Sequence, residues 1–150
     1  KLLAKIVHSK VPQHYFNYLK QAIENAYIVG NVVVTRLQEV DNPDIIPEVA
    51  DLMMRLQGAT WSFCIGRYQE AVHLSVRTTN PRKNAGLLMK LLVKGKGTGG
   101  GHGLMAGGKI DVPGQEAWQV YELEDRIEKE FIHRVQKASH SRIPLVEKVV

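Results

Sequence analysis

Residues 97–110 read GTGGGHGLMAGGKI and combine a dense run of glycines with a single histidine, His102. Eight of the chain's 13 glycines lie between Gly95 and Gly108. Such a run weakens a packed helix or strand, because glycine loses the most backbone entropy on folding and adds no side-chain packing. We therefore expect a loop here that needs positive φ angles or the close approach of a ligand to bare backbone.

Phosphate binding is the chemistry that this composition favours. Successive glycine amides can form a concave nest of N–H donors that holds phosphate oxygens without any side chain. His102 adds a ring donor that becomes charged near neutral pH, and Arg77 offers a planar fork for a phosphate or a base. The alternative interpretation is that the glycines serve only a tight turn and that His102 satisfies a backbone carbonyl.

The basic residues are concentrated around the same segment. The chain's formal net charge is +5, but the window from Arg77 to Lys109 carries +7 without a single acid, so the remaining residues sum to −2. A helix face built for solubility usually mixes both signs. This segment therefore favours an anion-facing surface; its basic residues are Arg77, Arg82, Lys83, Lys90, Lys94, Lys96 and Lys109.

Several other chemistries do not fit the sequence. Gly103, Gly108 and Lys109 match a phosphate-binding P-loop, but Ile110 lacks the hydroxyl that binds magnesium, and Pro113 and Gly114 follow where a helix should begin. A helix precedes the run, whereas a dinucleotide-binding turn needs a strand there. The sequence has no HExxH or CxxC motif, and no catalytic triad can be built from local spacing.

The helices and strands that position these residues can be predicted from the spacing of apolar residues and from the places of proline and glycine. We predict helices over 12–26, 47–57, 80–93 and 115–137, strands over 28–40 and 105–112, and a hairpin over 60–67 and 71–78. In the hairpin, His73, Ser75 and Arg77 alternate with apolar residues and share one face. In the last helix, Ala117, Val120, Tyr121, Ile127, Phe131 and Val135 are the expected buried positions. The order predicts an α/β fold with a mixed sheet covered by helices, and α+β is the alternative.

The length and composition of the chain limit the class of protein to which it can belong. A chain of 150 residues suits one globular, soluble domain, and no apolar run approaches the roughly 20 residues that span a bilayer. The single cysteine, Cys64, excludes an internal disulfide and suits the reducing cytoplasm, where we expect the protein. The chain begins at Lys1 without a methionine, which indicates a fragment.

Two linked motifs resemble a known family. The stretch Leu74-Ser-Val-Arg-Thr-Thr79, a helix, and then Gly99-Gly-Gly-His-Gly-Leu-Met-Ala-Gly107 are similar to the DHH-associated C-terminal domain of DHH phosphoesterases. The family pattern is an S-x-R-[ST] strand followed by a GGGHxxAAG loop. The chain departs from it at Met105, where alanine is commoner. The match covers roughly residues 28–112.

The resemblance implies a substrate-binding domain over 28–150, with residues 1–27 as the helical connector from an absent N-terminal catalytic domain. Manganese-dependent hydrolysis would occur in that domain, which bears Asp-His-His, a motif that this sequence lacks. The chain would hold no cofactor and would bind without cutting. The implied phosphate-binding residues are Arg77, Thr78, Gly99, Gly100, Gly101 and His102, with Lys83 and Asn84 at the rim; Asn84 could equally be a buried helix residue.

The expected partner is a short single-stranded nucleic acid or a phosphorylated nucleotide such as phosphoadenosine phosphate, and a homodimer is possible. The whole enzyme would be a hydrolase of the exonuclease or oligoribonuclease type. A second interpretation is a tRNA-binding module, since alanyl-tRNA synthetases end in a related domain. A third is an interaction domain that uses only a basic surface, with a steep salt dependence.

Overall fold

The structure, a computed structural model, describes residues 10–147. Its helices are α2 (Gln13–Asn25), α3 (Ile45–Met53), α4 (Ala85–Val93) and α5 (Ala117–Val135), with a 3-10 turn, η1 (Pro81–Lys83). Its strands are β1 (Tyr27–Val29), β2 (Val32–Glu39), β3 (Trp61–Tyr68), β4 (Ala71–Thr78), β5 (Thr98–Gly101), β6 (Met105–Asp111) and β7 (Arg142–Pro144).

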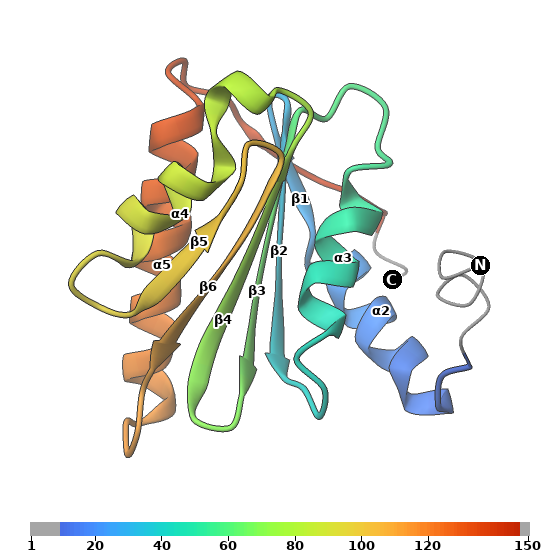
Figure 1. Cartoon of the computed structure of the whole chain (residues 1–150). Coiled ribbons are helices and arrows are strands. Elements are labelled where there is room, and N and C mark those ends of the chain that lie inside the picture. Colours follow the sequence, from blue (N-terminus) through green and yellow to red (C-terminus); the bar gives the residue numbers. More distant parts are fainter. Residues whose placement is uncertain (1–9, 148–150) are drawn as a thin grey trace.

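Within the described residues the strands form one mixed sheet in the order β5-β6-β4-β3-β2-β1-β7. The β2–β3 pair is parallel and is joined through α3, whereas the other neighbours are antiparallel. Figure 1 shows α4 and α5 on one face of the sheet and α2 and α3 on the other. The predicted α/β fold and the β3–β4 hairpin are confirmed.

The predicted single strand over 28–40 is wrong, because the chain reverses at Gly30. This glycine has φ +59, a left-handed torsion that breaks the strand into the antiparallel pair β1 and β2, with Val29 opposite Val32. A run rich in β-branched residues conceals a hairpin whose turn contains only Gly30 and Asn31. The strand β7, which pairs with β1, was not predicted at all.

Two helices begin or end elsewhere than predicted. α3 begins at Ile45 rather than at Pro47, which lies in the first turn, where its missing N–H costs nothing. The predicted helix over 80–93 is divided into η1 and α4 by Asn84, whose φ is +51. Asn84 is exposed and its Oδ1 accepts from Leu87 N at 3.1 Å, so it caps α4 and is not a buried helix residue.

A hydrophobic cluster fills each face of the sheet. Between the sheet and α4 and α5, Phe131 is fully buried, with its ring centroid 4.4 Å from that of Phe63. The cluster toward α2 and α3 includes Cys64, which is also fully buried and acts as a small apolar residue. On α5, Val120, Ile127 and Phe131 are buried as predicted, whereas Ala117 and Tyr121 are exposed.

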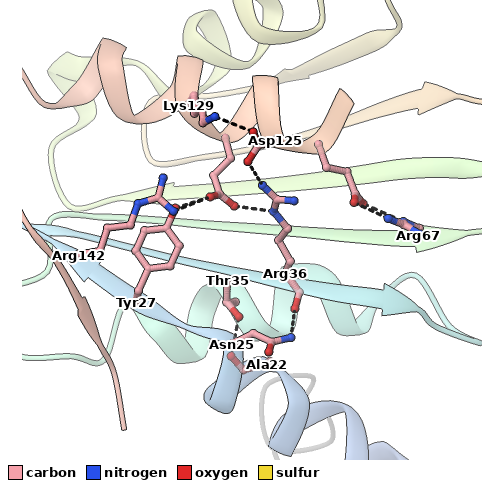
Figure 2. A network of polar contacts seen from close by, with 11 residues as sticks. Ala22, Asn25, Tyr27, Thr35, Arg36, Arg67, Asp125, Lys129 and Arg142 are labelled. Carbon is pink, nitrogen blue, oxygen red and sulfur yellow. Dashed lines mark hydrogen bonds and ion pairs between the residues drawn. The ribbon is translucent and has the colours of Figure 1, made fainter. Parts of the chain in front are cut away.

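Buried ion pairs also attach α5 to the sheet (Figure 2). Glu124 and Glu128 are each only 2% exposed. Arg67 donates to both oxygens of Glu124, at 2.7 and 3.1 Å, and Arg36 Nε donates to Glu128 at 2.7 Å. Carboxylates are buried at a large desolvation cost unless they are paired in this way. Burial and then the contact with Glu128 raise the pKa of Tyr27, so its phenol stays a donor to that carboxylate.

The described part of the predicted connector, α2, packs on β2. Thr35 Oγ1 donates to Ala22 O at 2.5 Å, and Asn25 Nδ2 donates to Arg36 O at 3.1 Å (Figure 2). Residues 1–9 of that segment lie outside the described residues. That residues 1–27 lead from another domain stays a prediction.

Candidate functional site

The glycine run forms a strand, contrary to the predicted loop. β5 pairs antiparallel with β6, with Gly99 opposite Gly108 and Gly100 opposite Gly107. The glycines with positive φ in the described residues do not include Gly99, Gly100 or Gly101. The predicted nest is therefore wrong, because strand pairing extends the backbone where a nest needs alternating torsions.

Most of these glycines are required by close packing. A Cβ on Gly101 would lie 2.2 Å from Met105 O. A Cβ on Gly99 would lie 2.8 Å from the Met89 Cγ of α4, which packs directly on this part of the sheet. Gly100 differs, since its nearest neighbour would be the Lys90 Cε at 3.9 Å. The fold leaves room for a side chain at Gly100.

The hydrogen-bond pattern leaves backbone donors at the sheet edge. Thr78 N donates to Leu104 O at 2.9 Å, so the even-numbered residues of β6 bond to β4 and the odd-numbered ones to β5. Gly100 therefore pairs with its neighbour strand, while the N–H groups of Gly99 and Gly101 point away from it. Because β5 is the edge strand, these two amides face outward. Of the three glycine amides predicted to bind phosphate, those of Gly99 and Gly101 face the sheet edge and that of Gly100 is used in strand pairing.

A surface cleft of about 740 Å³ lies where β4, β6 and β5 extend past α3. Strand alternation places the side chains of His73, Ser75 and Arg77 on this face, as the sequence predicted. Gly100 and Gly107 share the face, so the middle of the cleft floor is bare backbone. The wall is formed by Pro43, Ile46 and Pro47, and the cleft also contacts Thr98, Gly99, Gly101, His102, Met105 and Lys109.

Arg77 lies at one end of this cleft, opposite Met105 in the strand register. Its side chain is 11% exposed. Nε donates to Asp51 Oδ1 of α3 at 2.5 Å, and Nη1 donates to Val76 O at 3.0 Å. The guanidinium is thus held in one orientation while contacting the cleft, and Asp51 occupies one of its donors.

His102 lies in the turn between β5 and β6 and is exposed. Its backbone N–H donates to Met105 O at 2.9 Å, and its Nδ1 accepts from Leu104 N at 3.3 Å. Because Nδ1 accepts, the neutral ring carries its proton on Nε2. His102 therefore offers an Nε2–H donor at the same end of the cleft as Arg77.

The remaining predicted residues do not line the cleft. The Thr78 hydroxyl donates to Thr60 O at 2.9 Å, and the side chain is buried. Lys83 is exposed at the end of η1, and Asn84 caps α4. The side chains of Thr78 and Asn84 thus make structural hydrogen bonds outside the cleft.

Sequence reasoning missed Asp51, Thr98 and the role of His73 in the cleft. No local pattern relates Asp51 to Arg77, because α3 brings them together only in the fold. The strand alternation did place His73 beside Arg77. Burial, then the charge of Lys109, lowers the pKa of His73 below its usual value, and His73 Nε2 is buried with no hydrogen-bond partner among residues 10–147.

Residues 29–133 match the family model described as the DHHA1 domain. This match covers more than half of the chain, and the chain belongs to the DHHA1 domain family. The DHH-associated resemblance of the sequence is therefore confirmed.

Individual proteins are also similar to this chain. An uncharacterized protein of Methanocaldococcus jannaschii is 31% identical over 110 residues, which are 73% of this chain and 22% of that protein. The chain thus spans about a fifth of the length of this relative. An exopolyphosphatase-related protein from Bacteroides fragilis has a similar structure, with a TM-score of 0.57 and 14% identity over 89% of this chain and 40% of that one.

Two further solved structures are similar. The DHH domain of a member of the s1p family of ribosomal proteins has a TM-score of 0.50 and 14% identity, over 79% of this chain and 30% of that one. The C-Ala domain of Aquifex aeolicus alanyl-tRNA synthetase has a TM-score of 0.49 and 20% identity, over 68% of this chain and 96% of that one.

Within residues 10–147, no three His, Cys, Asp or Glu side chains are grouped so as to hold a metal ion. In the same residues, every helix is too short or too polar to cross a membrane.

Proposed function

We propose that this chain is the substrate-binding domain of a DHH phosphoesterase and that its cleft binds the phosphate of a short single-stranded nucleic acid or a phosphorylated nucleotide. One observation carries the proposal: the cleft brings the oriented guanidinium of Arg77 together with the Nε2–H of His102 beside a floor of bare glycine backbone. Both groups can donate hydrogen bonds to phosphate oxygens. The outward amides of Gly99 and Gly101 add donors at the adjoining edge.

Hydrolysis belongs, in this proposal, to a separate domain that carries Asp-His-His and binds manganese. The residues of this chain would hold the substrate while that domain acts on it. The 110 aligned residues are only 22% of the related protein, which leaves room for such a domain. The expected reaction class is hydrolysis of phosphodiester or phosphomonoester bonds.

Calorimetric titration of the 150-residue chain with a 5′-phosphorylated dinucleotide tests the proposal. Arg77→Ala should weaken binding by about thirtyfold, since a hydrogen bond to a charged group contributes about 2 kcal/mol. Arg77→Lys should lose nearly as much, because an ammonium cannot make the paired fork contact. Asp51, left without its partner, is exposed and its charge stays hydrated, so both variants should fold.

Lys94→Ala is the matched control. Lys94 is exposed beyond the end of α4 and does not line the cleft. Its loss should mainly reduce the salt dependence of binding. Equal losses at Arg77 and Lys94 would contradict a fitted cleft, and binding of folded tRNA but not of dinucleotides would favour the tRNA-binding interpretation.

A further inference from the structure

The helix α4 is apolar on every side, although its outer side faces solvent. Its nine residues, AGLLMKLLV, contain a single charged side chain, Lys90. A helix that is hydrophobic all round is ordinarily buried on all sides. α4 packs on β5, β6 and α5, yet Leu87 and Leu91 remain 58% and 40% exposed. Because they lie one turn apart, these two leucines form an apolar ridge along the outer side of the helix.

Exposed basic residues surround this ridge, without an acid among them. Among the ion pairs of residues 10–147, none includes a residue between Arg82 and Lys96. The exposed face of α5 is different, because it mixes both signs and forms two ion pairs one turn apart, Lys129 with Asp125 and Arg134 with Glu130. The basic residues around the ridge are Arg82, Lys83, Lys90, Lys94 and Lys96. We call the ridge and these residues the outer face of α4.

The chemistry of this face favours a protein over a nucleic acid or a second copy of the chain. Nucleobases stack on aromatic rings or arginine planes, so a nucleic acid would contact the lysines and leave both leucines uncovered. A two-fold contact between copies would place α4 against α4 and bring like charges together. An apolar centre within a polar rim is, by contrast, the usual anatomy of a protein interface.

We infer that the outer face of α4 docks an acidic amphipathic helix of a partner protein. The apolar stripe of that helix covers Leu87 and Leu91, and carboxylates beside the stripe pair with Lys83 and Lys90. The nine residues of α4 extend over only about 13 Å, so the contact belongs to the small, transient class of interfaces. α4 covers the face of the sheet opposite to α3 (Figure 1), whereas the cleft lies beside α3. The inference therefore does not rest on the proposed function.

A synthetic peptide tests this inference. The probe is an amphipathic helix of about four turns, with a leucine stripe between two rows of glutamates. Titrated into the isotope-labelled chain, it should shift the NMR resonances of α4 and leave those of Trp118 on α5 unchanged. Replacing Leu87 and Leu91 together by serine should weaken binding by about tenfold, because docking buries the exposed half of each side chain. Lys90→Gln should weaken it by about threefold, the size of an exposed ion pair.

Two matched variants control for general effects of charge and hydrophobicity. Trp118→Ser removes a side chain that is 62% exposed on α5, and Lys20→Gln removes an exposed charge on α2. Neither should change the affinity for the peptide, and a peptide whose leucines are replaced by serine should not bind. Circular dichroism of each variant checks that a change in affinity is not a loss of fold.

Several results would overturn the inference. The peptide fails to bind; or it binds the double leucine variant as tightly as the wild type, which would mean that the face attracts any anion. Self-association of the chain, seen by sedimentation and abolished in the leucine variant, would make a second copy the occupant. Arg77→Ala should bind the peptide like the wild type, so a chain that binds the peptide but no nucleotide would refute the proposed function and leave this inference standing.

Discussion

Two neighbouring glycines of β5 should respond in opposite ways to the same added methyl group. A Cβ on Gly101 would lie 2.2 Å from Met105 O and 2.6 Å from Ala106 Cα, and these backbone atoms move only if the β5–β6 pairing opens. A Cβ on Gly100 would meet nothing closer than the end of the Lys90 side chain, at 3.9 Å. The two changes are chemically identical, so only the surroundings differ.

The magnitudes follow from these distances. Overpacking of this kind costs about 1–3 kcal/mol. Replacement of a glycine by alanine at a compatible position stabilises by about 0.4–1 kcal/mol, because the unfolded chain loses conformational freedom. Gly101→Ala should therefore lower the free energy of unfolding by about 1–2 kcal/mol, and Gly100→Ala should raise it by about 0.5 kcal/mol. For a chain of this size the two midpoint temperatures should differ by roughly 5 °C.

Urea unfolding followed by circular dichroism, together with calorimetry, measures both free energies. Gly107→Ala is a further control, because it lies opposite Gly100 and its Cβ would be 3.6 Å from Leu74 O, an ordinary contact. Equal destabilisation by Gly100→Ala and Gly101→Ala would refute the reasoning, since it would mean that β5 needs glycine for its torsions and not for space.

Other changes test the remaining parts of the fold and site. Gly100→Ala should weaken binding of adenosine 5′-monophosphate, measured by calorimetry, because its methyl group lies on the cleft floor. Phe131→Ala should lower the free energy of unfolding, measured in urea, by about 3–5 kcal/mol, since the ring is fully buried. A loss as small as that expected for an exposed residue would contradict this packing. Glu124→Ala should cost about 3 kcal/mol by leaving Arg67 without its buried partner, whereas exposed Glu122→Ala should change little. The lowered pKa of His73 means that the folded state binds fewer protons there than the unfolded state, so the free energy of unfolding should fall as the pH drops below about 6.5. In His73→Gln, the free energy of unfolding should fall less over the same pH range.

The sequence predicted the architecture well where periodicity was strong. The β3–β4 hairpin and its polar face were evident from alternation, and the S-x-R-[ST] and GGGH motifs led to the family. Their pairing in the fold also brings Arg77 and His102 to one cleft. All of these features depend on residues that lie close together in the sequence.

Features that depend on distant contacts were not predictable in this way. Glycines carry no side-chain alternation, so β5 looked like a loop. Glu124 and Glu128 have the composition of a solvated helix face, and their burial is explained by contacts from distant strands, which include Arg67 for Glu124 and Arg36 and Tyr27 for Glu128. Asp51 precedes Arg77 by 26 residues and is brought to it by the crossover from β2 to β3 through α3.

The bare edge of β5 also has a consequence for association between molecules. An edge strand offers unpaired backbone groups to any other extended chain, and proteins usually block such edges with charged side chains, prolines or bulges. From Gly99 to Gly101 the strand itself has no side chain to do so; Lys90 of α4 lies near Gly100, and Gly86 of α4 lies against Gly101 O. The strand that leaves backbone amides open to a phosphate is thus also open to intermolecular β-pairing. A ligand bound along these amides would cover that edge and protect the protein from aggregation.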